Sequence, residues 1–147
     1  MSLLTSRRLL LLGIPAIIVA AGVASAAWMM GSTPEDLDLS LRKSTEAGRY
    51  VASIEPKAEP VTVGTMHSWT VTLQAPDGAP VQDAHFKVGG MPQHGHGLPT
   101  SPAVTQKLGG GRYLIEGMKF NMTGWWEIDL AIDGPAGADS VTFNLVL

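Results

Sequence analysis

The stretch Trp125-Trp126-Glu127-Ile128-Asp129-Leu130-Ala131-Ile132 decides the fold class of this chain. From 126 to 132 the even positions hold Trp, Ile, Leu and Ile, whereas the odd positions hold Glu, Asp and Ala. Successive side chains of a strand point to opposite faces, so this alternation places the apolar residues on one face. The stretch therefore predicts a half-buried β-strand.

The same period of two recurs along the chain from Tyr50 onward. It is clear in residues 69–73, 84–88 and 141–147. Clusters rich in Gly, Pro and Asp separate these segments, at 75–78, 109–111 and 133–137. Short strands divided by turns at this spacing are typical of a two-layer β-fold. We expect an all-β protein, an immunoglobulin-like sandwich of about seven strands.

The N-terminus has the composition of an export signal. Ser6-Arg7-Arg8 precedes an uncharged run from Leu9 to Met30, which predicts a signal or transmembrane helix over residues 1–30. The run reaches the roughly 20 residues that a membrane-spanning helix needs. Cleavage after Ala26, at the Ala24-Ser25-Ala26 signature, is the alternative. We expect a protein anchored on the periplasmic side of the inner membrane, or a periplasmic protein if the signal is cleaved.

Length and composition predict one exported domain. We interpret residues 31–49 as a linker and residues 50–147 as the domain, because about 100 residues suffice for one core. The formal net charge of −3 and the scattered Lys and Arg residues exclude nucleic acid as a partner. The chain has no cysteine, so the domain is held together by packing, and methionine and histidine are its only good soft-metal ligands.

The segment Met91-Pro92-Gln93-His94-Gly95-His96-Gly97 is the strongest candidate for a site. His94 and His96 are two residues apart, so in extended backbone both imidazoles point to the same side and are able to share one ion. Imidazole binds several transition metals, whereas the thioether of Met91 suits only a soft ion. The combination favours copper. The alternative is that such a loop is merely solvated.

A second methionine cluster follows at Met118-Lys119-Phe120-Asn121-Met122, just before the strand that starts at Trp125. A loop there could face the histidine loop from another part of the sandwich. We therefore expect Met118 or Met122, or both, to complete the site that His94 and His96 begin. The alternative for each methionine is packing in the core, since methionine often fills gaps there.

In residues 90–97, residues 116–122 and Gly124-Trp125-Trp126, the chain resembles the YtkA-like family of exported β-sandwich domains, which is related to the FixH-like proteins. The resemblance covers about residues 50–147. It implies an immunoglobulin-like fold, a membrane or periplasmic location, and a link to copper handling or to the assembly of respiratory copper enzymes. FixH-like loops are richer in methionine, whereas this loop has two histidines, and that difference admits Cu(II) as well as Cu(I).

Two function classes follow from the sequence. The first is a copper carrier or chaperone, without catalysis, that passes copper to a periplasmic or membrane metalloprotein. The second is a metal-independent interaction module that docks a membrane or haem protein. Enzyme classes are disfavoured, because the chain has neither a serine-centred elbow motif nor zinc-protease spacing. A histidine-brace oxygenase needs a mature N-terminal histidine, whereas cleavage after Ala26 would expose Ala27.

Overall fold

A computed structural model describes residues 33–92 and 97–147 of the chain. These residues form eight strands and no helix. The strands are β1 (Arg42–Ser44), β2 (Val51–Pro56), β3 (Met66–Gln74), β4 (His85–Pro92), β5 (Ala103–Gly109), β6 (Arg112–Lys119), β7 (Trp125–Gly134) and β8 (Gly137–Val146).

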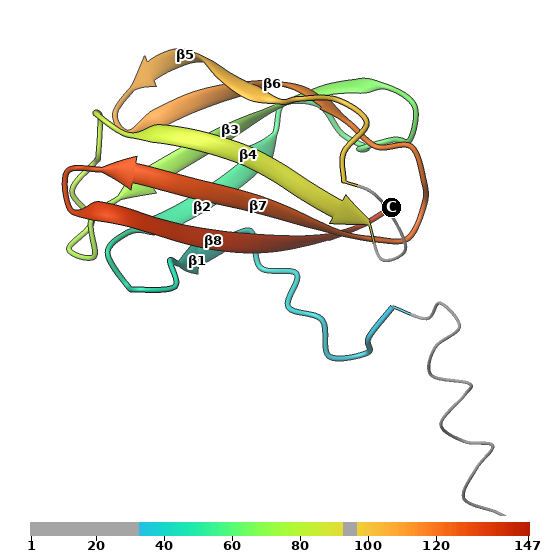
Figure 1. Cartoon of the computed structure of the whole chain (residues 1–147), viewed down its shortest axis with the longest axis horizontal. Coiled ribbons are helices and arrows are strands. Elements are labelled where there is room, and N and C mark those ends of the chain that lie inside the picture. The colour runs from blue at the N-terminus through green and yellow to red at the C-terminus, as the bar shows by residue number, and fades with distance from the viewer. Residues whose placement is uncertain (1–32, 93–96) are drawn as a thin grey trace, which may run out of the picture. The chain divides into compact units, whose positions relative to one another are not determined.

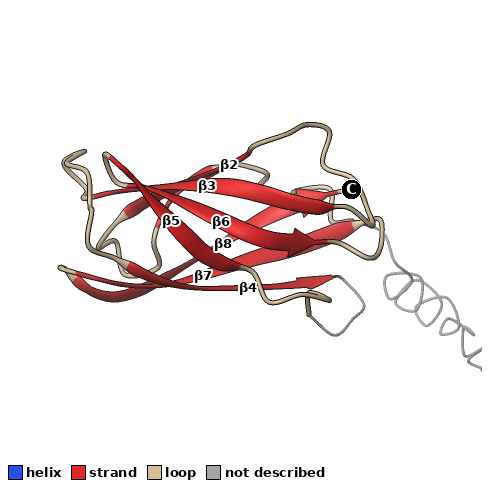
Figure 2. Ribbon diagram, turned by 90° about the horizontal axis from the view of Figure 1, so that it is seen from above, coloured by secondary structure: helices blue, strands red, loops and turns tan. Residues whose placement is uncertain are grey.

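The strands make two antiparallel sheets packed as a sandwich (Figures 1 and 2). One sheet has the order β1-β2-β3-β6-β5 and the other the order β4-β7-β8. Apart from β1, these are the strand orders of a constant-type immunoglobulin domain, with four strands in one sheet and three in the other. The predicted all-β sandwich is confirmed, with one strand more than expected.

The core follows the alternation read from the sequence. The four even positions from 126 to 132 in β7 are at most 2 % exposed. Opposite β7, the odd positions of β3 from Trp69 to Leu73 are equally buried. Apolar residues from both sheets therefore meet between the layers, and most polar residues of the strands lie outside, His67 of β3 being buried.

Strand β1 lies inside the segment interpreted as a linker, residues 31–49. Arg42 to Ser44 pair with β2, and the hydroxyl of Thr45 donates a hydrogen bond of 2.6 Å to Oδ2 of Asp139 in β8. Thr45 itself is buried. The ordered sandwich therefore begins before Tyr50, because the end of the expected linker closes the edge between the two sheets.

The predicted signal or anchor, residues 1–30, lies outside the residues that the structure describes. Among residues 33–92 and 97–147, no helix has the length and apolar character of a membrane span.

The antiparallel pairing sorts the connections into two ends (Figure 1). At one end, which we call the methionine end, lie residues 57–66, 91–92, 97–102, 118–124 and 145–147. At the other, which we call the tyrosine end, lie residues 45–50, 75–84, 110–113 and 134–137. The candidate residues that the structure describes all belong to the methionine end.

Candidate functional site

Met91 is the last residue but one of β4, on the outer face of the three-stranded sheet. Its neighbours Gly90 and Pro92 face inward, and Met91 is 52 % exposed. It lies opposite Glu127 of β7 in the ladder. Side chains at directly opposed positions are about 5 Å apart at Cβ. The thioether of Met91 therefore has a carboxylate as its cross-strand neighbour, which favours a cation there.

Met122 lies in the connection between β6 and β7 and is held there by a tryptophan. The indole Nε1 of Trp126 donates a hydrogen bond of 3.0 Å to the backbone carbonyl of Met122, whose side chain is 39 % exposed. Trp126 itself pairs with Pro92 of β4 in the ladder. One buried residue thus fixes both Met122 and the strand end that carries Met91.

Met118 has a different environment, because it is 1 % exposed and belongs to the hydrophobic core. A bulge turns it inward: Trp69 of β3 faces Ile115, but His67 faces Met118, so one residue of β3 opposes two of β6. Gly117 provides the positive φ of 86° within this bulge. Of the two roles that the sequence allowed for Met118, the structure places it in packing.

His94 and His96 lie in residues 93–96, outside the described part of the chain. The described residues on either side lie close together. A Cβ on Gly97 would stand 3.6 Å from the carbonyl oxygen of Gly90. A Cβ on Gly90 would stand 2.8 Å from the carbonyl oxygen of Glu127, so this close approach requires glycine. The two histidines therefore belong to a six-residue segment, 91–96, whose flanking glycines nearly touch.

His67 has a structural role in the fold. It is 8 % exposed, and its Nε2 lies 2.8 Å from the carbonyl oxygen of Thr62. Its ring packs at 6.3 Å from that of Phe120. His67 therefore holds the connection between β2 and β3 onto the core beside Met118.

The sequence did not reveal Trp126 as the residue that links the two candidate segments. Its period predicted only a core tryptophan, and it is buried, but its Nε1 also needs an acceptor. Trp125, on the outer face, donates from Nε1 to Asn144 Oδ1 at 3.0 Å. The signal that could have revealed the Trp126 link is the four-residue spacing from Met122, within reach of a turn.

Among the described residues there is no group of three or more His, Cys, Asp or Glu side chains suited to a metal ion. The donors that the structure does bring to this end are the thioethers of Met91 and Met122 and the carboxylate of Glu127. Thioethers bind soft ions such as Cu(I), and a carboxylate binds harder ones. The methionine end therefore offers thioether and carboxylate donors from β4, from β7 and from the connection between β6 and β7.

Comparisons with known proteins identify the family but no close relative. A search of curated proteins finds no match to the chain. A family model described as YtkA-like matches residues 53–131, a stretch that runs from β2 into β7 and includes the whole segment 91–97 and both Met118 and Met122. Since this match covers more than half of the chain, the protein belongs to the YtkA-like family.

Proposed function

We propose that this protein is an exported, membrane-anchored copper-binding protein that acts as a carrier or chaperone in periplasmic copper handling or respiratory-enzyme assembly. The observation that carries the proposal is the link through Trp126, which pairs with Pro92 and hydrogen-bonds Met122. Trp126 thereby contacts both segments that carry an exposed methionine, and His94 and His96 lie within five residues of Met91 in the sequence.

Covalent geometry limits how far the histidines are from these anchors. His94 is two residues from Pro92 and His96 is one residue from Gly97, so their Cα atoms lie within about 7 Å and 4 Å of described residues. Met91 immediately precedes Pro92. The proposed donor set is His94, His96, Met91 and Met122. Met118 is not part of it, because its side chain is buried in the core.

The chemistry of these donors favours copper over other metals. Zinc sites use Cys, His and carboxylates, whereas methionine thioethers select Cu(I), and the imidazoles also admit Cu(II). A carrier must release its cargo, and the exposed side chains of Met91 and Met122 meet that need. The proposal includes no catalytic step: the protein binds copper and passes it to a periplasmic or membrane metalloprotein.

The location rests on the sequence of residues 1–30. A helix there would hold the domain on the periplasmic side of the inner membrane, and cleavage after Ala26 would release it into the periplasm. Either location suits a protein without cysteine, because the domain depends on no disulfide. Fractionation of cells that express the full chain tests this part of the proposal. Recovery in the cytoplasm would contradict it.

The decisive experiment is a competition titration of Cu(I) with the wild type and three variants. We expect His94→Ala to weaken binding about 100-fold and Met122→Leu about tenfold, with stability changes below about 1 kcal/mol, since Leu for Met conserves volume. Met66→Leu is the matched control, because Met66 is exposed at the same end but extends from the five-stranded sheet. Equal losses in Met66→Leu and Met122→Leu would contradict the assigned site, and a wild type without copper would end the proposal.

The second candidate is the interaction module. One observation favours it: outside the segment 33–41, the exposed large apolar residues of the described chain all lie at the methionine end, namely Val63, Met66, Met91, Met122 and Val146. Clustered exposed apolar residues mark interaction sites. The double variant His94→Ala/His96→Ala separates the two candidates, because an interaction module would keep its activity in the cell.

A further inference from the structure

The hydrogen-bond phase of the β7–β8 ladder shows which backbone groups of β8 point away from the sheet. Gly124 and Leu147 bond each other in both directions, at 2.8 and 3.0 Å. Such pairs alternate with non-bonded pairs along an antiparallel ladder. The amide and carbonyl groups of Ser140, Thr142, Asn144 and Val146 must therefore face the outer edge of β8.

The first half of this edge is already covered. The carbonyl of Ser140 accepts a hydrogen bond from the amide of Glu46 at 2.8 Å, and the carbonyl of Thr142 accepts one from Nζ of Lys43 at 3.2 Å. In the second half, the backbone groups of Asn144 and Val146 have no backbone partner among residues 33–92 and 97–147. The N-terminal segment thus bonds the backbone of the first half of the edge. In the second half, among the described residues, it contacts a side chain instead, because Nδ2 of Asn144 donates a hydrogen bond of 2.9 Å to the carbonyl oxygen of Asp38.

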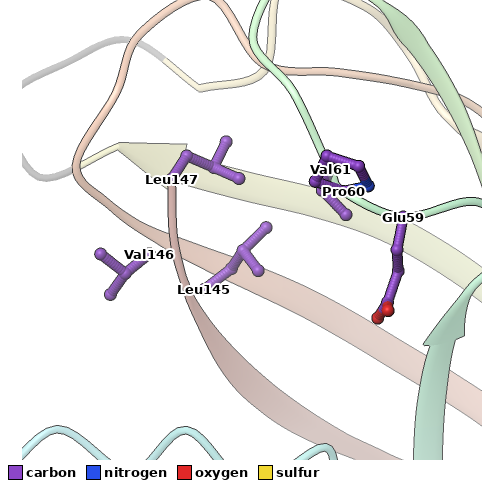
Figure 3. Close-up of a pocket in the computed structure, with 6 residues that line it drawn as sticks. All are labelled: Glu59, Pro60, Val61, Leu145, Val146 and Leu147. Atoms are coloured by element: carbon purple, nitrogen blue, oxygen red, sulfur yellow. The ribbon is translucent and has the colours of Figure 1, made fainter.

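The second half of the edge forms one wall of a groove of about 590 Å³. Figure 3 shows Leu145, Val146 and Leu147 on one side of it and Glu59, Pro60 and Val61 on the other. The lining is apolar except for the carboxylate of Glu59. A free strand edge beside an apolar groove has the form of a site that accepts an additional strand.

We propose that this groove receives an extended segment of a partner protein, which adds to β8 as a further strand, places an apolar side chain against Leu145 and Val61, and sets a basic side chain beside Glu59. The edge from Asn144 to Leu147 spans about 10 Å at roughly 3.4 Å per residue, enough for three or four residues of the partner. The inference does not depend on copper.

Charge and size favour a partner segment over a second copy of this chain. The tail from Val141 to Leu147 has no basic residue to complement Glu59. An edge of four residues also buries far less surface than the roughly 1,200 Å² or more that a stable dimer needs. An extended segment needs only main-chain hydrogen bonds and one pocket for an alternate side chain.

Amide hydrogen exchange, followed by NMR on the full chain, tests the proposal with the synthetic peptide acetyl-Val-Lys-Val-Lys-Val-amide as probe. We expect saturating peptide to slow exchange at Asn144 and Val146 at least about fivefold. The amides of Phe143 and Leu145 already face β7, so their exchange should not change. No protection at Asn144 and Val146 would overturn the proposal, and so would protection that rises with protein concentration alone, since that reports a second copy.

Three variants distinguish specific docking from adsorption. Glu59→Lys should reduce the protection to less than about twofold, whereas Glu55→Lys, an exposed acid of β2 outside the groove, should leave it unchanged. Val146→Pro removes an amide that points outward and makes no ladder bond, so it should abolish docking with an unchanged melting temperature. Equal protection in all three variants would overturn the proposal.

Discussion

The two ends of the sandwich differ in how many hydrogen bonds hold their described connections and in how many apolar side chains they expose. At the tyrosine end, the hydroxyl of Tyr50 donates to Gly137 O at 2.7 Å and accepts from the amide of Ala136 at 3.0 Å. Tyr113 likewise donates to Val81 O at 2.6 Å and accepts from the amide of Ala84. The hydroxyl of Tyr50 thus holds the turn between β7 and β8, and that of Tyr113 holds the connection between β3 and β4. Burial raises the pKa of Tyr113, so its hydroxyl keeps the proton that it donates.

The methionine end has fewer polar ties and more exposed apolar side chains. The described connections there are held by a few hydrogen bonds each, such as Trp126 to Met122 O, Gly64 to Phe120 O at 2.7 Å and the pair between Gly124 and Leu147. One end with many hydrogen bonds, the tyrosine end, is thus enough to align the two sheets. The other end is then free to present side chains for binding, as loops on rigid scaffolds commonly do.

The largest expected difference between the ends is in their response to mild acid. Between pH 7 and 5, copper affinity should fall by roughly 100-fold or more, because an imidazole, whose ordinary pKa is about 6.5, must lose its proton to bind and the proposed site has two. The fold should not respond over the same range, since the carboxylate that anchors the tyrosine end titrates lower. Competition titrations alongside thermal melts measure both, and a flat copper affinity would exclude the histidines as main ligands.

The next effect separates the two methionines at the same end. Met118→Ala should destabilise the domain by about 2–5 kcal/mol, because it leaves a cavity in the core, whereas Met122→Ala should cost less than about 0.5 kcal/mol, as for an exposed site. Urea denaturation of both variants provides the measurement. Similar losses would mean that Met122 also packs in the core.

Removal of the segment before Tyr50 should weaken the tyrosine end. A chain that starts at Tyr50 lacks β1, the Thr45 bonds to Tyr50 and Asp139, and the Glu46 bond to Ser140. At about 0.5–1 kcal/mol for each of these net hydrogen bonds, we expect it to fold but to be about 2–4 kcal/mol less stable than a chain that starts at Thr33. Equal melting curves would show that residues 33–49 act only as a linker.

The smallest predicted effect is acid destabilisation through Asp139. Partial burial raises the pKa of this carboxyl, but hydrogen bonds from Thr45 and from the amides of Ala47, Ser140 and Arg49 outweigh it and lower the pKa from 3.8 to about 2. Because its pKa is lower in the folded state, the ionised carboxylate stabilises the fold above about pH 4. This stabilisation is lost as the pH falls from about 5 to 2. We expect a loss of about 1 kcal/mol after solvent screening.

The variant Asp139→Asn isolates this contribution. It has no charge to titrate, so its free energy of unfolding should change less between pH 5 and 2 than that of the wild type. Chemical denaturation at several pH values gives the comparison. Parallel curves for the two proteins would assign the acid sensitivity to other carboxyls.

The period-two pattern predicted most of the fold, because inward residues of β3, β7 and β8 must be apolar wherever two sheets share a core. It could not predict β1, since Arg42-Lys43-Ser44 has no apolar alternation and forms a strand only because the edge of β2 is there to pair with it. This short charged segment has no strong preference of its own for a strand, so its conformation is set by tertiary contacts.

The site was predictable in part. The structure shows Met91 and Met122 exposed and Met118 buried, whereas spacing alone could not separate Met118 from Met122. That Met91 and Met122 are ligands stays a prediction. The bulge at Gly117 shifts the inward phase from Tyr113 and Ile115 to Met118, and such a shift depends on the pairing with β3. An isolated glycine inside a strand pattern was the only sequence signal of it.

The hydrogen bond from Trp126 to Met122 also makes intrinsic tryptophan fluorescence a probe of the methionine end. Indole emission depends on the polarity around the ring and on the hydrogen bond at Nε1, and this ring lies between Met122, Pro92 and Phe120, whose ring is 5.1 Å away. Trp69 is buried in the core, and its Nε1 has no hydrogen-bond partner among the described residues, so it supplies a steady background. Any event that displaces Met122 should therefore change the colour and intensity of the protein's own fluorescence, without a dye or a label.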